Sequence, residues 1–157
     1  MRRLIYLAVA LIVVSLTGCG SFKEISVNSA NVEKISPYGL KGVDVALAVE
    51  VDNPAPQVRL SDMEAILKCS GKVLGKVVVD PFTMKGRSVE IYHLNARMNL
   101  DEDISLYDVL MLLDKKFIDN CTVDVTVKGK LRSGLSKTVT KKDLPVKKLL
   151  KYAENKK

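Results

Sequence analysis

The segment from Val43 to Asp52 alternates apolar residues with polar or small ones, and this pattern limits the possible folds more than any other feature of the chain. Successive side chains of a β-strand point to opposite faces, so the alternation predicts a long strand with one buried face. Asn53-Pro54 ends this strand, because proline has no N–H for sheet pairing and holds the residue before it extended. We therefore expect a fold built on a β-sheet.

A hairpin is expected soon after this strand. Residues 63–69 and 73–79 both have strand-like apolar patterns, and the short turn Ser70-Gly71-Lys72 separates them. Two later segments with the same kind of pattern, residues 121–128 and 135–140, are joined by a turn at Arg132-Ser133-Gly134. The chain thus has several short strands with turns between them, as in an all-β domain.

One further strand is expected from Val89 to Leu100. Its later apolar residues share one face, whereas Val89 and Ile91 fall on the opposite face, so we expect a bulge or twist near Ile91. With this segment the chain has six or seven strands. The pattern therefore predicts a mainly β fold, an antiparallel β-sandwich.

A single segment changes from strand to helix periodicity. Its apolar residues at helical spacing are Leu106, Val109, Leu110, Leu113 and Phe117. The acidic residues Asp101–Asp103 precede it and Lys115-Lys116 end it, as the helix dipole favours, and Ser105 with Asp108 can form a capping box. We expect one added α-helix over about residues 103–117. The acidic residues could also hold a cation, but helix capping explains them without a metal.

The N-terminal segment has the features of a bacterial lipoprotein signal. Arg2-Arg3 is followed by an apolar run up to Leu16, which is shorter than the roughly 20 residues that span a bilayer. The run ends in Leu16-Thr17-Gly18-Cys19, which looks like a lipobox, so Cys19 is the expected site of lipid attachment. The alternatives are a plain secretory signal and a short uncleaved anchor.

This interpretation divides the chain into four parts. Residues 1–18 are the expected signal peptide, 19–24 the lipidated cysteine and a short linker, 25–145 the domain, and 146–157 a basic tail. The expected partner of Cys19 is membrane lipid, since two or more acyl chains on one residue hold a protein stably on a bilayer. Gly20 stands where aspartate would mark inner-membrane retention in many proteobacteria, which favours the outer membrane.

The net charge is +7, or 23 − 18 = +5 once Arg2 and Arg3 leave with the signal peptide, and a moderate excess of this kind suits a surface near an anionic membrane. Nucleic-acid binding is the competing interpretation of a pI near 9.3. We discount it because an exported protein meets little nucleic acid and no basic run contains spaced aromatic residues. The tail residues 147–152 form a basic amphipathic stretch that could lie on lipid, although we favour an end that packs on the sandwich.

Two cysteines remain once Cys19 is assigned to lipidation. Cys69 and Cys121 both lie inside apolar strand patterns, so we expect two separate buried thiols that act as small hydrophobic residues. The alternative is a disulfide between them, which an exported protein can form.

No catalytic, metal or cofactor site is expected. His93 is the only histidine and alternates along a strand, so it is expected at a surface or half-buried position, and it makes no zinc-binding pattern with the cysteines. The sequence has no Gly-x-Ser-x-Gly motif, and Leu135 stands where a phosphate-binding loop needs lysine. We therefore expect a protein that is not an enzyme.

Two features together resemble a known family. The long strand ending in Val51-Asp52-Asn53-Pro54 and the later turn region Gly71–Gly75 are similar to the late-embryogenesis-abundant (LEA) type 2 domain and the related water-stress WHy domain. The resemblance covers most of residues 25–145, although Ala55 stands where the family often has a second asparagine. It implies an immunoglobulin-like or fibronectin-III-like sandwich with an added helix, and non-enzymatic roles in desiccation or osmotic stress.

These observations support two hypotheses about function. The first is a lipid-anchored binding or stress-protective module of the cell envelope, with an envelope protein as a possible partner. The alternative is an envelope carrier or assembly factor for an apolar ligand or a partner lipoprotein, which would need a cavity between the sheets.

Overall fold

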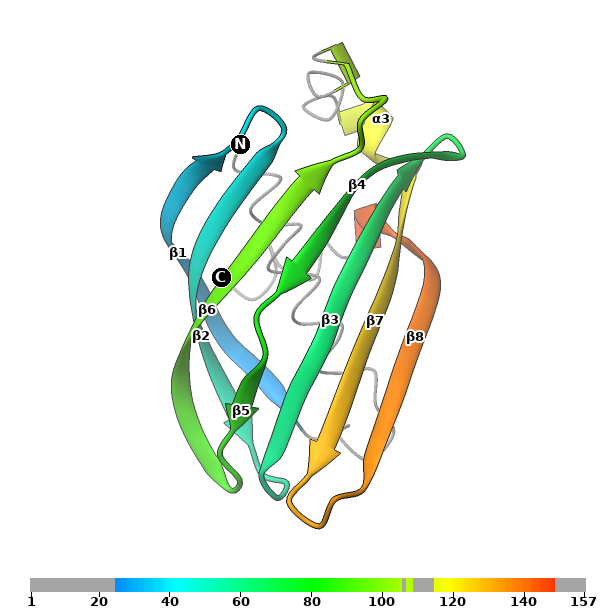
Figure 1. Cartoon of the computed structure of the whole chain (residues 1–157). Helices are drawn as coiled ribbons and strands as arrows, with labels where there is room; N and C mark the ends of the chain where they lie inside the picture. The colour runs from blue at the N-terminus through cyan, green and yellow to red at the C-terminus, as the bar shows by residue number, and fades with distance from the viewer. Residues whose placement is uncertain (1–24, 106, 109–114, 149–157) are drawn as a thin grey trace.

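The structure, a computed structural model, describes residues 25–105, 107–108 and 115–148. The strands are β1 (Ser26–Tyr38), β2 (Gly42–Asn53), β3 (Val58–Cys69), β4 (Lys72–Val79), β5 (Phe82–Met84), β6 (Ser88–Leu100), β7 (Cys121–Leu131) and β8 (Ser136–Pro145), and the short helix α3 is Lys115–Ile118. The expected mainly β, antiparallel, sandwich-like fold is confirmed (Figure 1).

The strands form one antiparallel sheet in the order β1-β2-β6-β4-β3-β7-β8, and β5 pairs with β3. Strand β4 joins the two halves of this sheet, because it pairs with β3 on one side and with the end of β6 on the other. After β4 the chain leaves β6, and β5 continues beside β3. Strands β1 and β8 are the two edges, and most of their side chains are exposed.

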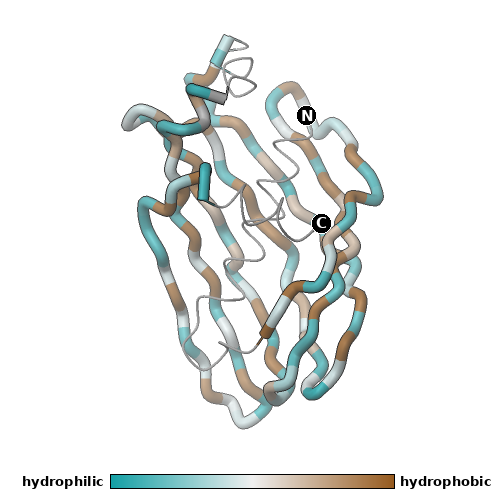
Figure 2. The backbone as a smooth tube through the Cα atoms, turned by 180° about the vertical axis from the view of Figure 1, so that it is seen from behind, coloured by the Kyte–Doolittle hydropathy of each residue, from teal (hydrophilic) through white to brown (hydrophobic). Residues whose placement is uncertain are grey.

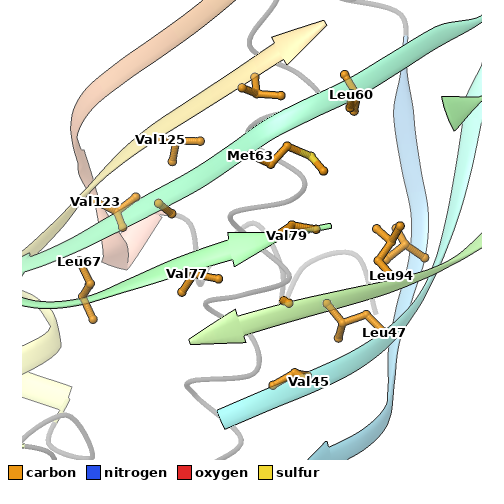
Figure 3. Close-up of a cluster of buried hydrophobic side chains, with 14 of the residues drawn as sticks. Val45, Leu47, Leu60, Met63, Leu67, Val77, Val79, Leu94, Val123 and Val125 are labelled. Carbon is orange, nitrogen blue, oxygen red and sulfur yellow. The ribbon is translucent and has the colours of Figure 1, made fainter. Parts of the chain in front are cut away.

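The alternation in β2 has the predicted effect. Val45, Leu47, Val49 and Val51 are at most 8% exposed, and the residues between them are half-buried. Figure 2 shows hydrophobic and hydrophilic residues alternating in this way along the strands. Side chains from β2, β3, β4, β6 and β7 meet in one core (Figure 3). Full burial of each Val or Leu side chain stabilises the fold by about 1.5–3 kcal/mol.

The expected bulge near Ile91 is wrong. The pairing of β2 with β6 runs without a shift from Gly42 opposite Asn99 to Asn53 opposite Ser88. Val89 and Ile91 keep the outward parity of their strand and are 55% and 58% exposed. The prediction was wrong because it treated Val89 and Ile91 as buried on the ground that they are apolar. An apolar side chain can also lie on a face exposed to solvent.

A bulge occurs in β3 instead, where Asp62 has a φ of 50° and the pairing with β7 shifts between Ser61 and Glu64. Leu60 before the bulge and Met63 after it are both buried, although they are three positions apart. The extra residue thus returns the apolar side chains of β3 to the core face. The predicted turn after β3 is present, and Ser70 and Gly71 both have positive φ, as a two-residue hairpin turn of this kind requires.

The predicted helix lies partly outside the described residues. Within them, Tyr107, Asp108 and α3 are helical, whereas Asp103 lies in a turn and the helix has not begun at Ser105. The capping box is present: the Asp108 carboxylate accepts bonds from the Ser105 N–H (2.9 Å) and hydroxyl (2.7 Å), and the Asp108 N–H donates to Ser105 Oγ (3.2 Å). The two bonds that its carboxylate accepts from Ser105, first the one from the N–H and then the one from the hydroxyl, lower the pKa of Asp108.

The sandwich has two ends that differ in what they carry. We call the end where β1 begins the proximal end; it comprises Ile25 and the connections 54–57, 85–87 and 132–135, at the bottom of Figure 1. We call the opposite end, with turns 39–41 and 70–71 and the segment 101–105, the distal end.

Candidate functional site

The predicted lipobox residues Leu16, Thr17, Gly18 and Cys19 lie outside the described residues. Ile25, where the described chain starts, is 2% exposed and belongs to the proximal end. The few residues from Cys19 to Ile25 span at most about 20 Å when fully extended. Cys19 therefore lies within that distance of the proximal end. Among the described residues, no helix is long and apolar enough to cross a membrane.

Asn53, the first residue of the family motif, is the only buried polar residue in the described part of the chain, at 1% exposure. Its Nδ2 donates to the carbonyl oxygens of Lys85 (3.1 Å) and Pro56 (3.4 Å), and its Oδ1 accepts from the N–H of Ala55 (3.0 Å). Pro54 is exposed and ends the strand. Asn53 thus holds two proximal connections together, a structural role that leaves none of its polar atoms for a ligand.

The contact between these two connections is close. A Cβ at Gly86 would lie 2.5 Å from the backbone nitrogen of Gln57, so only glycine fits there. The N–H of Arg87 donates to the carbonyl of Ala55 over 3.0 Å. The Asn-Pro motif therefore explains local folding and does not form a binding pocket.

The proximal end carries a set of basic side chains that the sequence prediction missed. Arg59 and Lys130 face each other across β3 and β7. Arg87 and Arg132 lie in two other turns of the same end, which follow β5 and β7. All four are exposed, and within the described chain none of their side chains forms an ion pair. Lys85, beside them, pairs with Glu90 at 3.4 Å. We call Arg59, Lys85, Arg87, Lys130 and Arg132 the basic end surface.

An exposed apolar residue accompanies this surface. Leu135 is 70% exposed in the turn that follows Arg132, and its carbonyl accepts a 2.8 Å hydrogen bond from the N–H of Leu131. The signal that could have found this surface was the pairing of strands, because only the register brings Arg59 beside Lys130.

Other charged groups form pairs across the outer faces of the sheet. Arg97 donates twice to Asp44 (Nε–Oδ1 2.7 Å, Nη2–Oδ2 3.1 Å) and lies 3.8 Å from the centre of the Tyr38 ring. The hydrogen bond from Arg97 lowers the pKa of Asp44. His93 is exposed, as expected, with Nδ1 2.9 Å from a carboxylate oxygen of Glu33. The Arg97–Asp44 pair links the neighbouring strands β6 and β2, whereas His93 of β6 reaches across β2 to Glu33 of β1. Neither pair forms a nucleophile–base arrangement.

A second network lies on the other half of the sheet. Lys68 donates to one carboxylate oxygen of Asp124, and the N–H of Asp143 donates to the other over 2.9 Å. The bond from Lys68 and then the bond from Asp143 lower the pKa of Asp124. This network joins three strands, β3, β7 and β8.

Two lysines bind the backbone of the acidic segment at the distal end. Lys41 donates to the backbone carbonyls of Asp101 (3.5 Å) and Glu102, and Lys72 donates to that of Asp103 (3.3 Å). In the described part of the chain, no group of three or more His, Cys, Asp or Glu side chains is placed to hold a metal ion.

Cys69 and Cys121 form a disulfide, so the expectation of two separate thiols is wrong. The physical reason is register: Cys69 ends β3, Cys121 begins β7, and the two strands are antiparallel neighbours, which places the residues opposite each other. In the tail, Val146 is fully buried and Lys147 pairs with Asp119 at 3.1 Å. Residues 149–157 of the tail lie outside the described chain.

No family model and no curated protein matches this sequence. Among solved structures, a protein from Archaeoglobus fulgidus is similar at 14% identity with a TM-score of 0.40, over 74% of this chain and 94% of that chain. The archaellum periplasmic stator protein FlaG from Sulfolobus acidocaldarius is similar at 9% identity with a TM-score of 0.26, over 72% and 98% of the two chains. The GAE domain of GGA2p from Saccharomyces cerevisiae follows at 10% identity with a TM-score of 0.29, over 75% and 88%. Similarity this low carries no argument about function.

Proposed function

We propose that this protein is a non-enzymatic lipoprotein of the bacterial cell envelope, anchored through acylated Cys19. Its LEA type 2-like domain would act as a binding or stress-protective module under desiccation or osmotic stress. We place it at the outer membrane because of Gly20, with membrane lipid and a further envelope protein as its partners and no nucleic acid.

The observation that carries this proposal is the Cys69–Cys121 disulfide. Each residue is 2% exposed, and the bond joins adjacent strands of the core. Buried structural disulfides persist in oxidising compartments and are rare in the reducing cytosol. The disulfide and the Leu16–Cys19 motif are independent features, and both point to export.

The described cysteine, histidine and asparagine side chains form no nucleophile–base pair, which supports the proposed non-enzymatic role. Both described cysteines are in the disulfide, His93 lies on an exposed face beside Glu33, and the buried Asn53 is fully bonded to backbone groups. A nucleophile needs a base within hydrogen-bond reach, and these groups do not provide one.

The core favours a binding module over a carrier of an apolar ligand. The largest fully buried side chains come from several strands and include Leu47, Leu67, Leu74 and Met84. They occupy the interior that a carried lipid would need. Native mass spectrometry of protein purified from membranes separates the two: the proposal expects the acylated polypeptide alone, and an additional bound lipid would support the carrier.

A deletion strain tests the physiological part of the proposal. Survival after drying and after exposure to high salt is compared for the deletion strain, the strain complemented with the wild-type gene, and the strain complemented with Cys19→Ser. We expect the wild-type gene alone to restore survival, because an unanchored domain would not be held at the membrane. Unchanged survival of the deletion strain, with no partner recovered from solubilised membranes, would contradict the proposal.

A further inference from the structure

We propose that the proximal end of the domain lies against an anionic membrane surface, with the basic end surface on the lipid phosphates and Leu135 in the headgroup region. This inference rests on the proposed anchor at Cys19 and adds an orientation to it. It assigns the distal end, with Leu40 and the acidic segment 101–105, to the side that faces away from the lipid.

The length of the linker favours this orientation. Cys19 lies within about 20 Å of the buried Ile25, the first residue of the proximal end. Strand β2 has 12 residues and runs from the distal to the proximal end, which corresponds to about 40 Å. A tether of this length allows the proximal end to reach the membrane, whereas a domain standing on its distal end is beyond its reach.

The charges at the two ends favour the same orientation. At the proximal end, Arg59, Arg87, Lys130 and Arg132 are exposed and unpaired among the described residues, and the nearby Glu90 is paired with Lys85. At the distal end, the exposed Asp101, Glu102 and Asp103 lie beside the exposed Lys41 and Lys72, so acidic and basic groups are mixed there. Each Lys or Arg near an anionic bilayer shifts a binding equilibrium about fivefold toward the surface. Anionic lipid therefore attracts the proximal end more strongly than the distal end, where the acidic side chains offset the lysines.

Leu135 adds an apolar contact at the tip of the same end. It is 70% exposed, and the bond between the Leu131 N–H and the Leu135 carbonyl closes its turn. An apolar residue surrounded by basic ones is the combination that interfacial anchors use, since the charges bind phosphates and the apolar group enters the lipid.

The test uses tryptophan fluorescence, because the chain has no natural tryptophan. The full lipidated protein is prepared as Leu135→Trp and, for the distal end, as Leu40→Trp, a position that is fully exposed. Both are reconstituted into vesicles of brominated phosphatidylcholine, with and without phosphatidylglycerol, and quenching by the brominated lipid is measured. A flotation assay on the same samples reports whether the anchor holds.

We expect quenching of Leu135→Trp to exceed that of Leu40→Trp several-fold when phosphatidylglycerol is present. Adding Arg59→Gln, Lys130→Gln and Arg132→Gln to Leu135→Trp should remove most of this quenching while flotation is retained, and high salt should act the same way. The matched control, Lys34→Gln, Lys141→Gln and Lys148→Gln, replaces three exposed lysines away from the proximal end and should leave the quenching unchanged.

The outcomes separate the inference from the anchor. Flotation with equal quenching at both ends, or with quenching that the triple Gln variant does not reduce, would overturn the orientation and leave the anchor intact. An unquenched Leu135→Trp would likewise overturn it. Loss of flotation in the unaltered protein would overturn the anchor, and the orientation with it.

Discussion

Cys69 and Cys121 lie directly opposite each other at the ends of β3 and β7, where their sulfur atoms form a disulfide and their Cα atoms are 4.1 Å apart. The two residues are 52 positions apart in the sequence, and the loop between them contains β4, β5, β6 and α3. The disulfide thus encloses about a third of the chain in one loop. It fixes the two ends of this loop to each other where β3 ends and β7 begins.

Removing this disulfide is expected to lower the free energy of unfolding by about 2–4 kcal/mol, because the crosslink restricts the unfolded chain and the loop is long. The change is Cys69→Ala with Cys121→Ala, and the measurement is urea unfolding with and without a thiol reductant. Reductant should lower the unfolding midpoint of the wild type and leave that of the double variant unchanged. If the unfolding midpoint of the wild type stays the same when reductant has access to the unfolded protein, the result would contradict the presence of the disulfide.

Asn53→Ala is expected to lower the free energy of unfolding by about 1–3 kcal/mol, because it leaves the carbonyls of Lys85 and Pro56 and the N–H of Ala55 without their partner. Asn53→Asp should also destabilise, since a carboxylate cannot donate to the two carbonyls. The control is Asn31→Ala on β1, an exposed asparagine without a side-chain hydrogen bond in the described chain, with an expected change below about 0.5 kcal/mol. Equal effects at Asn53 and Asn31 would show that the motif does not hold the two connections together.

Stability should fall in acid partly through Asp124. Its pKa is lowered in the folded protein, first by the hydrogen bond from Lys68 and then by that from Asp143, so its stabilising effect is complete above the unfolded carboxyl pKa of about 4. That effect is lost as the pH falls through the lowered pKa, because the unfolded chain takes up the proton first. We expect the difference in unfolding midpoint between wild type and Asp124→Asn to be largest near neutral pH and to shrink as the pH falls below about 4, the pKa of the unfolded carboxyl group.

The control for this pH effect is Asp124→Asn in a Lys68→Gln background, which lacks the hydrogen bond from Lys68 to Asp124. There the difference that Asp124→Asn causes should vary less with pH. The same pH dependence in both backgrounds would mean that the bond from Lys68 does not contribute to acid stability.

Replacing Arg97 with lysine is expected to weaken the outer face of β2 and β6 although the charge is kept. Lysine cannot make the two parallel bonds to Asp44 and does not stack on Tyr38 as the planar guanidinium does. The prediction is a lower unfolding temperature for Arg97→Lys than for the wild type, and a smaller effect of the same substitution in an Asp44→Asn background. The same effect in both backgrounds would show that Arg97 and Asp44 are not coupled.

The strands of the core could be predicted because one face of each strand is buried along its length and carries apolar side chains. Val45 to Val51 show this: every second side chain is buried, so the order of residues carries the structure of the strand. Pro54, Pro81 and Gly71 likewise mark real strand ends and turns, because their backbone restrictions act locally.

What could not be predicted depends on which strands are neighbours. The disulfide and the pair Arg59–Lys130 both follow from the register of β3 against β7, which local patterns do not contain. The predicted bulge near Ile91 was wrong for a related reason. The pairing of β6 with β2 keeps Val89 and Ile91 on the outer face although both are apolar. The bulge at Asp62 was not predicted. The apolar residues change there from even to odd positions, and a strand that begins after Asp62 explains this change equally well.

The central claim is that Cys19 carries the lipid that holds this domain at a membrane. Its most direct test is incorporation of a labelled fatty acid in cells that make either the wild type or Cys19→Ser, followed by separation of the membranes. The account predicts label on the wild-type protein, found with the outer membrane, and neither label nor acylated product for Cys19→Ser. Acylation and membrane association that persist unchanged in Cys19→Ser would contradict it.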